Sequence, residues 1–149
     1  MMQRIFGWFT HFRMRRLEWL LAIYTVFFGA ALMLPPVSMA SGSFVWLLAA
    51  MPESTWGALY FIVGTLHAMA LHVNGRAAWT PFARLAALTL NSQVFLAMAL
   101  YLTKSNPFGT GVITYGFIAI GFCGTCIAAA AYDCGKEIAI WRGQRNVGN

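Results

Sequence analysis

Residues 85–103 read LAALTLNSQVFLAMALYLT and form one of four long stretches without Asp, Glu, Lys or Arg. A helix rises about 1.5 Å per residue, so roughly 20 residues are enough to cross the hydrocarbon of a bilayer. The other three stretches lie between Glu18 and Glu53, between Glu53 and Arg76, and between Lys104 and Asp133. The sequence therefore predicts an all-α, polytopic membrane protein with four transmembrane helices.

The composition agrees with this class. The chain has 149 residues, of which 60% are hydrophobic and 9% are charged. An average soluble domain is about 25% charged, so this chain lacks the residues for a water-facing shell. We expect a single four-helix transmembrane domain over residues 1–149. The net charge of +6 is interpreted as membrane anchoring and not as nucleic-acid binding, because arginines gather just before the first apolar stretch.

Prolines and glycines set the expected ends of the spans. A proline cannot donate to a helix ladder and restricts the residue before it, so Pro35 and Pro36 end the first span. Pro52 and Pro81 suit the first turns of the second and third spans. The expected spans are 17–34, 54–73, 81–103 and 110–132, followed by a cytoplasmic tail, 133–149, that can continue as a helix to Arg142.

Basic residues predict the orientation. They gather in the amino-terminal segment, in the connection between the second and third spans, and in the tail, whereas Lys104 alone lies in the other two connections. The positive-inside rule then places both termini in the cytoplasm. Ser38-Met39-Ala40 resembles a signal cleavage site, but the preceding apolar run is long for a signal peptide, and the first span is expected to be retained. A bacterial inner membrane is the expected location.

Two shorter segments are predicted to lie along the membrane surface. In segment 1–16, helical spacing puts large apolar side chains on one face and basic side chains on the other, as in an amphipathic interfacial helix; a flexible basic tail is the alternative. The expected anchors are Arg4, Trp8, Arg13, Arg15 and Arg16. The segment Phe44–Met51 is too short to span, and with Ser41 and Ser43 as caps it is expected to form a short outer interfacial helix.

Uncharged polar residues gather near the middle of the third span. At about 100° per residue, Thr89, Ser92 and Gln93 share one side of the helix, and Asn91 points nearly the opposite way. An amide in lipid lacks hydrogen-bond partners, so both sides are expected to meet protein, which favours a homo-oligomer. These residues either line a hydrated passage or bond neighbouring helices together.

His67 is the ionisable residue expected deepest in a span. A haem ligand, a metal ligand and a proton-sensitive gate are conceivable roles. A structural role is preferred, with the imidazole bonded to Gln93 or Thr125, because no second ligand is evident. We therefore expect no metal site and no cofactor site.

Cys123-Gly124-Thr125-Cys126 has the spacing of a thiol redox motif, and Cys134 adds a third sulfur. A quinone-linked thiol enzyme would need a second cysteine pair, which the chain does not have. We interpret the three residues as small hydrophobic side chains.

Small residues predict where helices pack closely. Gly64 and Ala68 in the second span, and Gly116, Gly121 and Gly124 in the fourth, would let backbones approach each other. The fourth span has the most glycines and is expected to make the tightest contact.

Two functions remain open at this point. Catalysis is not expected, because the four acidic residues are predicted near the interfaces and no nucleophile has an evident base. The small size, short loops, charged ends and mid-span amides are similar in general design to the holins of bacterial viruses, which implies a self-associating pore or membrane-lesion former. The alternative is a non-catalytic accessory, exclusion or assembly subunit that packs against another membrane protein.

Overall fold

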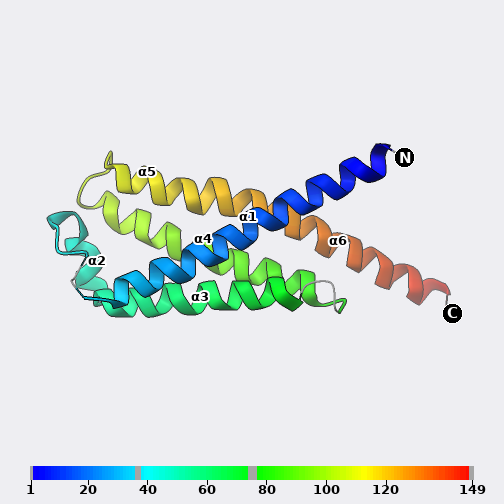
Figure 1. Ribbon diagram of the computed structural model, residues 1–149, viewed down its shortest axis with the longest axis horizontal. Coiled ribbons are helices and arrows are strands. Elements are labelled where there is room, and N and C mark those ends of the chain that lie inside the picture. Colours follow the sequence, from blue (N-terminus) through cyan, green and yellow to red (C-terminus); the bar gives the residue numbers. More distant parts are fainter. Residues whose placement is uncertain (1, 36–37, 74–76, 148–149) are drawn as a thin grey trace.

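The computed structural model describes the chain except for residues 1, 36–37, 74–76 and 148–149, and it describes no side chains for 2–14 and 144–147. All its regular elements are helical: α1 (Met2–Met33), η1 (Gly42–Phe44), α2 (Val45–Ala50), α3 (Glu53–Val73), α4 (Thr80–Thr103), α5 (Thr110–Gly116), η2 (Phe117–Phe122) and α6 (Cys123–Val147). Figure 1 shows α1 crossing the face formed by α3 and α4, with both termini at the same end of the molecule.

Four helices are long and apolar enough to cross a membrane, which confirms the expected all-helical class. They are Arg15–Met33, Glu53–Val73, Thr80–Thr103 and Thr110–Gly143. The second and third agree with the expected spans to within one residue. The fourth continues beyond the expected end at 132, because residues 133–147 contain no proline that would stop a helix.

The amino-terminal segment is not a separate helix, in contrast to the expectation from its amphipathic pattern. It continues into the first apolar stretch as one helix, α1. The joining residues Arg13 to Leu17 are all good helix formers, so nothing in the sequence interrupts the hydrogen-bond ladder there. Arg15 and Arg16 are exposed. The side chains of Arg4, Trp8 and Arg13 lie outside the described part of the structure.

The closest approach of helices is between α1 and α3, and three glycines permit it. A Cβ atom at Gly57 would lie 2.8 Å from the carbonyl oxygen of Gly29, and a Cβ atom at Gly64 would lie 2.7 Å from the backbone nitrogen of Val26. Such distances are too short for real side chains, so these positions need glycine. The expectation that the fourth span makes the tightest contact is wrong within the chain, because a Cβ atom at Gly116 or Gly124 would meet nothing within 4 Å.

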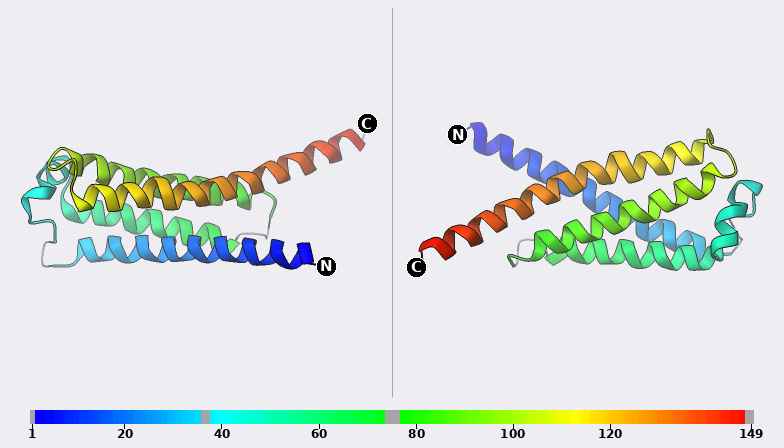
Figure 2. Two further views of the ribbon diagram at one scale, coloured as in Figure 1. Left: turned by 90° about the horizontal axis from the view of Figure 1, so that it is seen from above. Right: turned by 180° about the vertical axis from the view of Figure 1, so that it is seen from behind.

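The fourth span combines α5, η2 and α6 into one continuous helix, as Figure 2 shows. The segment η2 is a π-helix. A π-helical turn shifts the hydrogen-bond register, and such turns occur frequently at functional sites. The Ser92 hydroxyl of α4 donates to the carbonyl oxygen of Ala119 at 2.9 Å, so α4 supplies a partner to the π-helical segment. A Cβ atom at Gly121 would meet only the side chain of Phe117 in the same segment.

The connection between α1 and α3 is held against the start of α3. The Glu53 carboxylate accepts hydrogen bonds from the backbone N–H groups of Ser38 and Met39 and from the Ser38 hydroxyl. The segment expected to form a short helix is helical, as η1 and α2, but the Ser41 side chain makes no capping hydrogen bond. The backbone carbonyl of Ser41 instead accepts from the N–H of Phe44.

Aromatic rings fill one part of the core. The Tyr60 ring packs edge-to-face on Phe28 and on Phe95, with centroid distances of 5.0 and 5.1 Å. Tyr60 also donates a hydrogen bond to the carbonyl oxygen of Val94 at 2.8 Å. We call Tyr24, Phe28, Tyr60, Phe95 and Tyr115 the aromatic cluster.

Candidate functional site

Arg84 lies at a point where three helices meet and contacts a carboxylate on each of the other two. Its Nη2 donates to Oδ2 of Asp133 on α6 at 2.8 Å, and its Nε lies 3.1 Å from Oε2 of Glu18 on α1. Glu18 is 1% exposed, Arg84 3% and Asp133 14%. Removing one partner from a buried ion pair costs several kcal/mol, so Arg84 ties α1, α4 and α6 together.

A second set of polar contacts joins α1, α3 and α4. The Asn91 amide nitrogen lies 3.2 Å from Nδ1 of His67 and 3.2 Å from the carbonyl oxygen of Ala87. The Asn91 carbonyl oxygen accepts from the hydroxyl of Thr25 at 2.8 Å. His67, Asn91 and Thr25 are fully buried. This arrangement satisfies an amide in the interior of the bundle without any help from another chain.

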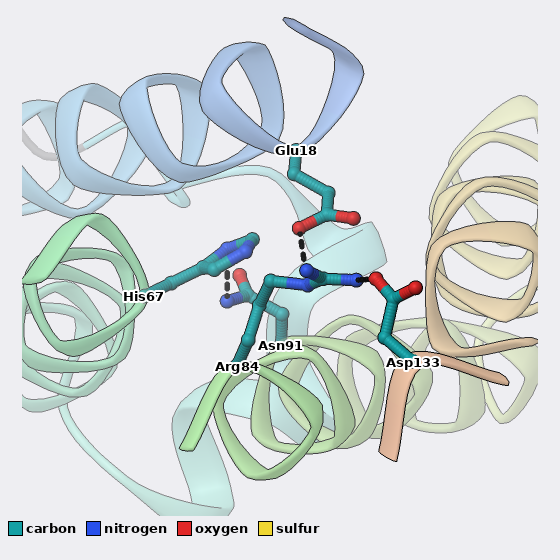
Figure 3. A network of polar contacts seen from close by, with 5 residues as sticks. All are labelled: Glu18, His67, Arg84, Asn91 and Asp133. Atoms are coloured by element: carbon teal, nitrogen blue, oxygen red, sulfur yellow. Dashed lines mark hydrogen bonds and ion pairs between the residues drawn. The ribbon is translucent and has the colours of Figure 1, made fainter. Parts of the chain in front are cut away.

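The two sets form one polar cluster, which we define as Glu18, Thr25, His67, Arg84, Asn91 and Asp133. Figure 3 shows five of these residues gathered between the helices, with the imidazole of His67 directed toward the space beside Glu18 and Arg84. Each of the four long helices contributes at least one member. The cluster is therefore a site that only the assembled bundle creates.

A spacing of seven residues explains why these side chains meet. Seven residues turn a helix through about 700°, only 20° short of two full turns, so residues i and i+7 share a face. Glu18 and Thr25 are related in this way on α1, and Arg84 and Asn91 on α4. Once one member of each pair faces the core, packing turns the other inward as well.

Several atoms of the polar cluster are buried and make no hydrogen bond to any described residue. They are both carboxylate oxygens of Glu18, Nε2 of His67 and Nε of Arg84. An unsatisfied buried polar atom costs about 1–3 kcal/mol. Oε2 of Glu18 and Nε of Arg84 lie 3.1 Å apart as an ion pair, so the unused hydrogen-bonding capacity of the cluster lies at Oε1 of Glu18 and Nε2 of His67.

The other polar residues expected at mid-span do not join the cluster. Thr89, Gln93 and Thr125 are exposed, and Ser92 is half-buried against η2. The expectation that His67 bonds to Gln93 or Thr125 is wrong: Asn91 occupies the inner face of α4, which directs Gln93 outward. Thr125 donates to the carbonyl oxygen of Phe122 in its own chain segment.

The cysteines are all buried and form no disulfide. Cys123 and Cys126 belong to the hydrophobic core. Among the residues that the structure describes, no group of three or more His, Cys, Asp or Glu side chains is placed to hold a metal ion. Ala68, on α3 beside His67, is half-buried.

The sequence matches no known family model, and no characterised protein or solved structure is significantly similar to it.

Sequence reasoning missed Glu18, Arg84 and Asp133 as members of a site. It placed Glu18 and Asp133 near the interfaces and counted Arg84 with the connection between the second and third spans, because each lies close to an end of an apolar stretch. The seven-residue spacing from Arg84 to Asn91, and from Asp133 back to Cys126, was the available signal. That spacing places a charged residue on the face that enters the core.

Proposed function

We propose that this chain is an integral membrane protein that self-associates through the outer face of α4 and forms hydrated lesions between protomers, in the manner of a holin. The observation that carries the proposal is the exposure of Gln93 in the middle of α4, two residues from the fully buried Asn91. In hydrocarbon an amide without a partner costs several kcal/mol. A second copy of α4 offers the complementary donor and acceptor.

The outer face of α4 consists of exposed residues at helical spacing, namely Ala86, Thr89, Leu90, Gln93 and Leu100. The hydroxyl of Thr89 donates to the carbonyl oxygen of Leu85 in the same helix, so it does not need a partner from elsewhere. The amide of Gln93 has no hydrogen bond to any described residue. Interhelical amide bonds stabilise association by about 0.6–2 kcal/mol, and small residues such as Ala86 let helices approach.

The closed core supports a passage between protomers and not through one protomer. The aromatic cluster fills one part of the core, and Tyr60 and Phe95 are fully buried there. A continuous water path would have to displace these rings. Polar residues on the outside of α4 are therefore the better candidates for contact with water in an assembly.

The proposed location is a bacterial inner membrane with both termini in the cytoplasm. Both termini lie at one end of the molecule (Figure 1), as four crossings require. In the sequence, Arg15, Arg16, Lys136 and Arg142 lie on the terminal sides of the first and fourth spans, whereas Lys104 follows the third span. This distribution supports the orientation by the positive-inside rule. Lipid and further copies of the chain are the proposed partners.

A non-catalytic role forms part of the proposal. Glu18 and Asp133, two of the four acidic residues of the chain, both contact Arg84. Glu53 is occupied by the loop that it holds. These contacts leave three of the carboxylates in structural roles.

An accessory subunit of another membrane complex is the second candidate, and the fourth span favours it. Only 17% of the most apolar part of this helix is buried within the chain, compared with 33% to 44% for the other three spans. Gly116 and Gly124 have no neighbour at the Cβ position. A partner helix could approach the fourth span closely at these two positions.

The test compares Gln93→Leu with Thr125→Val, which removes another exposed polar group whose hydrogen bond stays within its own chain. Association in lipid vesicles is measured by cross-linking yield against dilution, and lesion formation by release of a trapped dye. We expect Gln93→Leu to weaken association about 3-fold to 30-fold and to abolish dye release, while Thr125→Val changes neither. A chain that remains monomeric in lipid, or vesicles that stay sealed at every protein density, would refute the lesion-forming role and favour the accessory role.

A further inference from the structure

The hydrogen bonds of Asn91 determine which ring nitrogen of His67 carries a proton. The amide group facing the carbonyl oxygen of Ala87 must be the NH2, because two carbonyl oxygens cannot bond to each other. The same NH2 then donates its second hydrogen to Nδ1 of His67. A neutral imidazole that accepts at Nδ1 carries its proton at Nε2. His67 therefore presents a buried N–H donor at Nε2.

The donor of His67 has no acceptor among the described residues, and Glu18 has acceptors without a donor. Nε2 of His67 and both carboxylate oxygens of Glu18 are buried without a hydrogen bond. Figure 3 shows the imidazole directed toward the space bordered by the Glu18 carboxylate and the Arg84 guanidinium. The two unsatisfied groups thus belong to different helices, α3 and α1, within the same polar cluster.

We propose that the space beside His67, Glu18 and Arg84 is a binding site for buried water. A water molecule there accepts from Nε2–H of His67 and donates to a carboxylate oxygen of Glu18. Buried waters typically make about three hydrogen bonds to polar groups that would otherwise be unsatisfied. Nε2–H of His67 supplies one donor and Oε1 of Glu18 one acceptor, and Oε2 of Glu18, which lies 3.1 Å from Nε of Arg84 without a hydrogen bond, can accept a further one.

The proposed water extends a series of hydrogen bonds that already joins helices of the bundle. Beyond His67 the series continues through Asn91 to Thr25, whose hydroxyl lies 2.8 Å from Oδ1 of Asn91 and 2.7 Å from the carbonyl oxygen of Leu21. The Thr25 hydroxyl can donate its proton to only one of these two carbonyl oxygens at a time. The hydrogen bonds at this end of the series therefore have two possible arrangements. The inference is independent of the proposed function, because it concerns the interior of one protomer.

The charged groups around the site favour water over a metal ion or an anion. Arg84 and Arg15 act electrostatically on Glu18 with positive charge, and Asp133 with negative charge. Arg84 also acts on His67. A cation in this site would be repelled by the guanidinium of Arg84, and an anion would be repelled by the carboxylates of Glu18 and Asp133. A neutral molecule that both donates and accepts avoids both conflicts.

The experiment uses the full chain, labelled with 15N-histidine, in lipid nanodiscs. Long-range 1H–15N correlation identifies the tautomer of each histidine, and transfer of magnetisation from water identifies ring N–H groups in contact with water. His67→Gln assigns the His67 signals by their disappearance. We expect His67 to carry its proton at Nε2 and to receive magnetisation from water.

Two variants separate the proposed site from general hydration. Glu18→Leu removes the acceptor and makes the space apolar, and apolar cavities stay dry; transfer to Nε2–H should fall at least about tenfold. Glu137→Leu, on α6, is the matched control and should leave it unchanged. A proton at Nδ1, or an absence of water transfer to His67 in the unaltered protein, would overturn the proposal even if Glu18→Leu failed to fold. Equal transfer in Glu18→Leu and the unaltered protein would overturn it too.

Discussion

The inner and outer faces of α4 each carry an amide side chain, but the two amides have opposite environments. Asn91 on the inner face is fully buried and contacts Thr25 and His67 from two other helices. Gln93 on the outer face is exposed and has no hydrogen bond to any described residue. Both are amides within the same turn of one helix. The comparison shows that a polar residue in a long apolar helix does not by itself indicate a pore or an interface.

Geometry decides which amide the chain satisfies by itself. Two residues turn a helix through about 200°, so Asn91 and Gln93 cannot face the same neighbours. The inner face also carries Arg84, seven residues before Asn91, and this arginine fixes the rotation of α4 by its contacts to Glu18 and Asp133. The ion pairs therefore determine indirectly that Gln93 faces outward.

Removing Arg84 should have the largest effect on the inner face of α4. Arg84→Leu removes the cation from beside the buried Glu18 carboxylate and breaks the contact to Asp133, and we expect the free energy of unfolding to fall by about 3–5 kcal/mol. Reversible unfolding by sodium dodecyl sulphate in mixed micelles measures this change. Arg142→Leu, which removes an exposed arginine of α6, should change stability by less than about 0.5 kcal/mol. Equal effects of the two variants would contradict the role of Arg84 in orienting α4.

The packing of α1 on α3 brings the partners of the inner face into place, and Gly29 tests it. A Cβ atom at Gly29 would lie 2.6 Å from the carbonyl oxygen of Gly57, so Gly29→Ala must push the two backbones apart. We expect a loss of about 3 kcal/mol in the same unfolding measurement. Gly116→Ala, where no atom lies within 4 Å, should be neutral or stabilising by up to about 1 kcal/mol. A stable Gly29→Ala protein would show that the close approach is not required.

The four long helices could be predicted from the sequence because about 20 residues that are predominantly apolar and carry no charge are typical of a helix able to cross a bilayer. Every charge-free stretch long enough to cross a bilayer contains a long apolar helix in the structure, and Pro52 and Pro81 lie next to helix starts as expected. The tightest contact could not be predicted in the same way. Glycine content favoured the fourth span, but close packing needs glycines that face each other on two helices, as Gly29 and Gly57 do.

The polar cluster was only partly predictable. His67 and Asn91 stood out because they lie deep in apolar stretches, but the sequence did not reveal that they contact each other. Glu18 was assigned to an interface, and Arg84 to the connection between the second and third spans, because each lies near an end of its stretch. Their burial follows from the crossing of α1 over α4 and from the length of α6, and both are properties of the assembled bundle.

Asn91→Leu directly tests the difference between the inner and outer faces of α4. The substitution leaves Nδ1 of His67 without its partner, and we expect a loss of about 2 kcal/mol in the free energy of unfolding of the monomer. Gln93→Leu should leave the same quantity within about 0.5 kcal/mol, because its amide has no partner inside the chain. Unfolding is measured at protein-to-detergent ratios at which the chain is monomeric. A larger effect at Gln93 than at Asn91 would reverse the assignment of inner and outer faces.

Ser92 lies between the two faces and provides the smallest and most local test. Its hydroxyl donates to the carbonyl oxygen of Ala119 in η2, where the π-helical turn alters the usual pairing of backbone groups. Ser92→Ala should cost about 0.5–1.5 kcal/mol in the free energy of unfolding. Thr89→Val removes a hydroxyl whose bond stays within α4 and should have a smaller effect.

For Ser92→Ala, the segment that loses protection from hydrogen exchange is more informative than the size of the loss in the free energy of unfolding. If Ser92 supports the π-helical turn, amide hydrogen exchange in Ser92→Ala should accelerate in η2, near Ala119, and stay unchanged in α3. A residue that merely packs against the fourth span would lower protection evenly along that helix. Unchanged exchange at η2 would show that the π-helical turn is maintained by its own chain segment, and that α4 contributes to the fold only through its inner face.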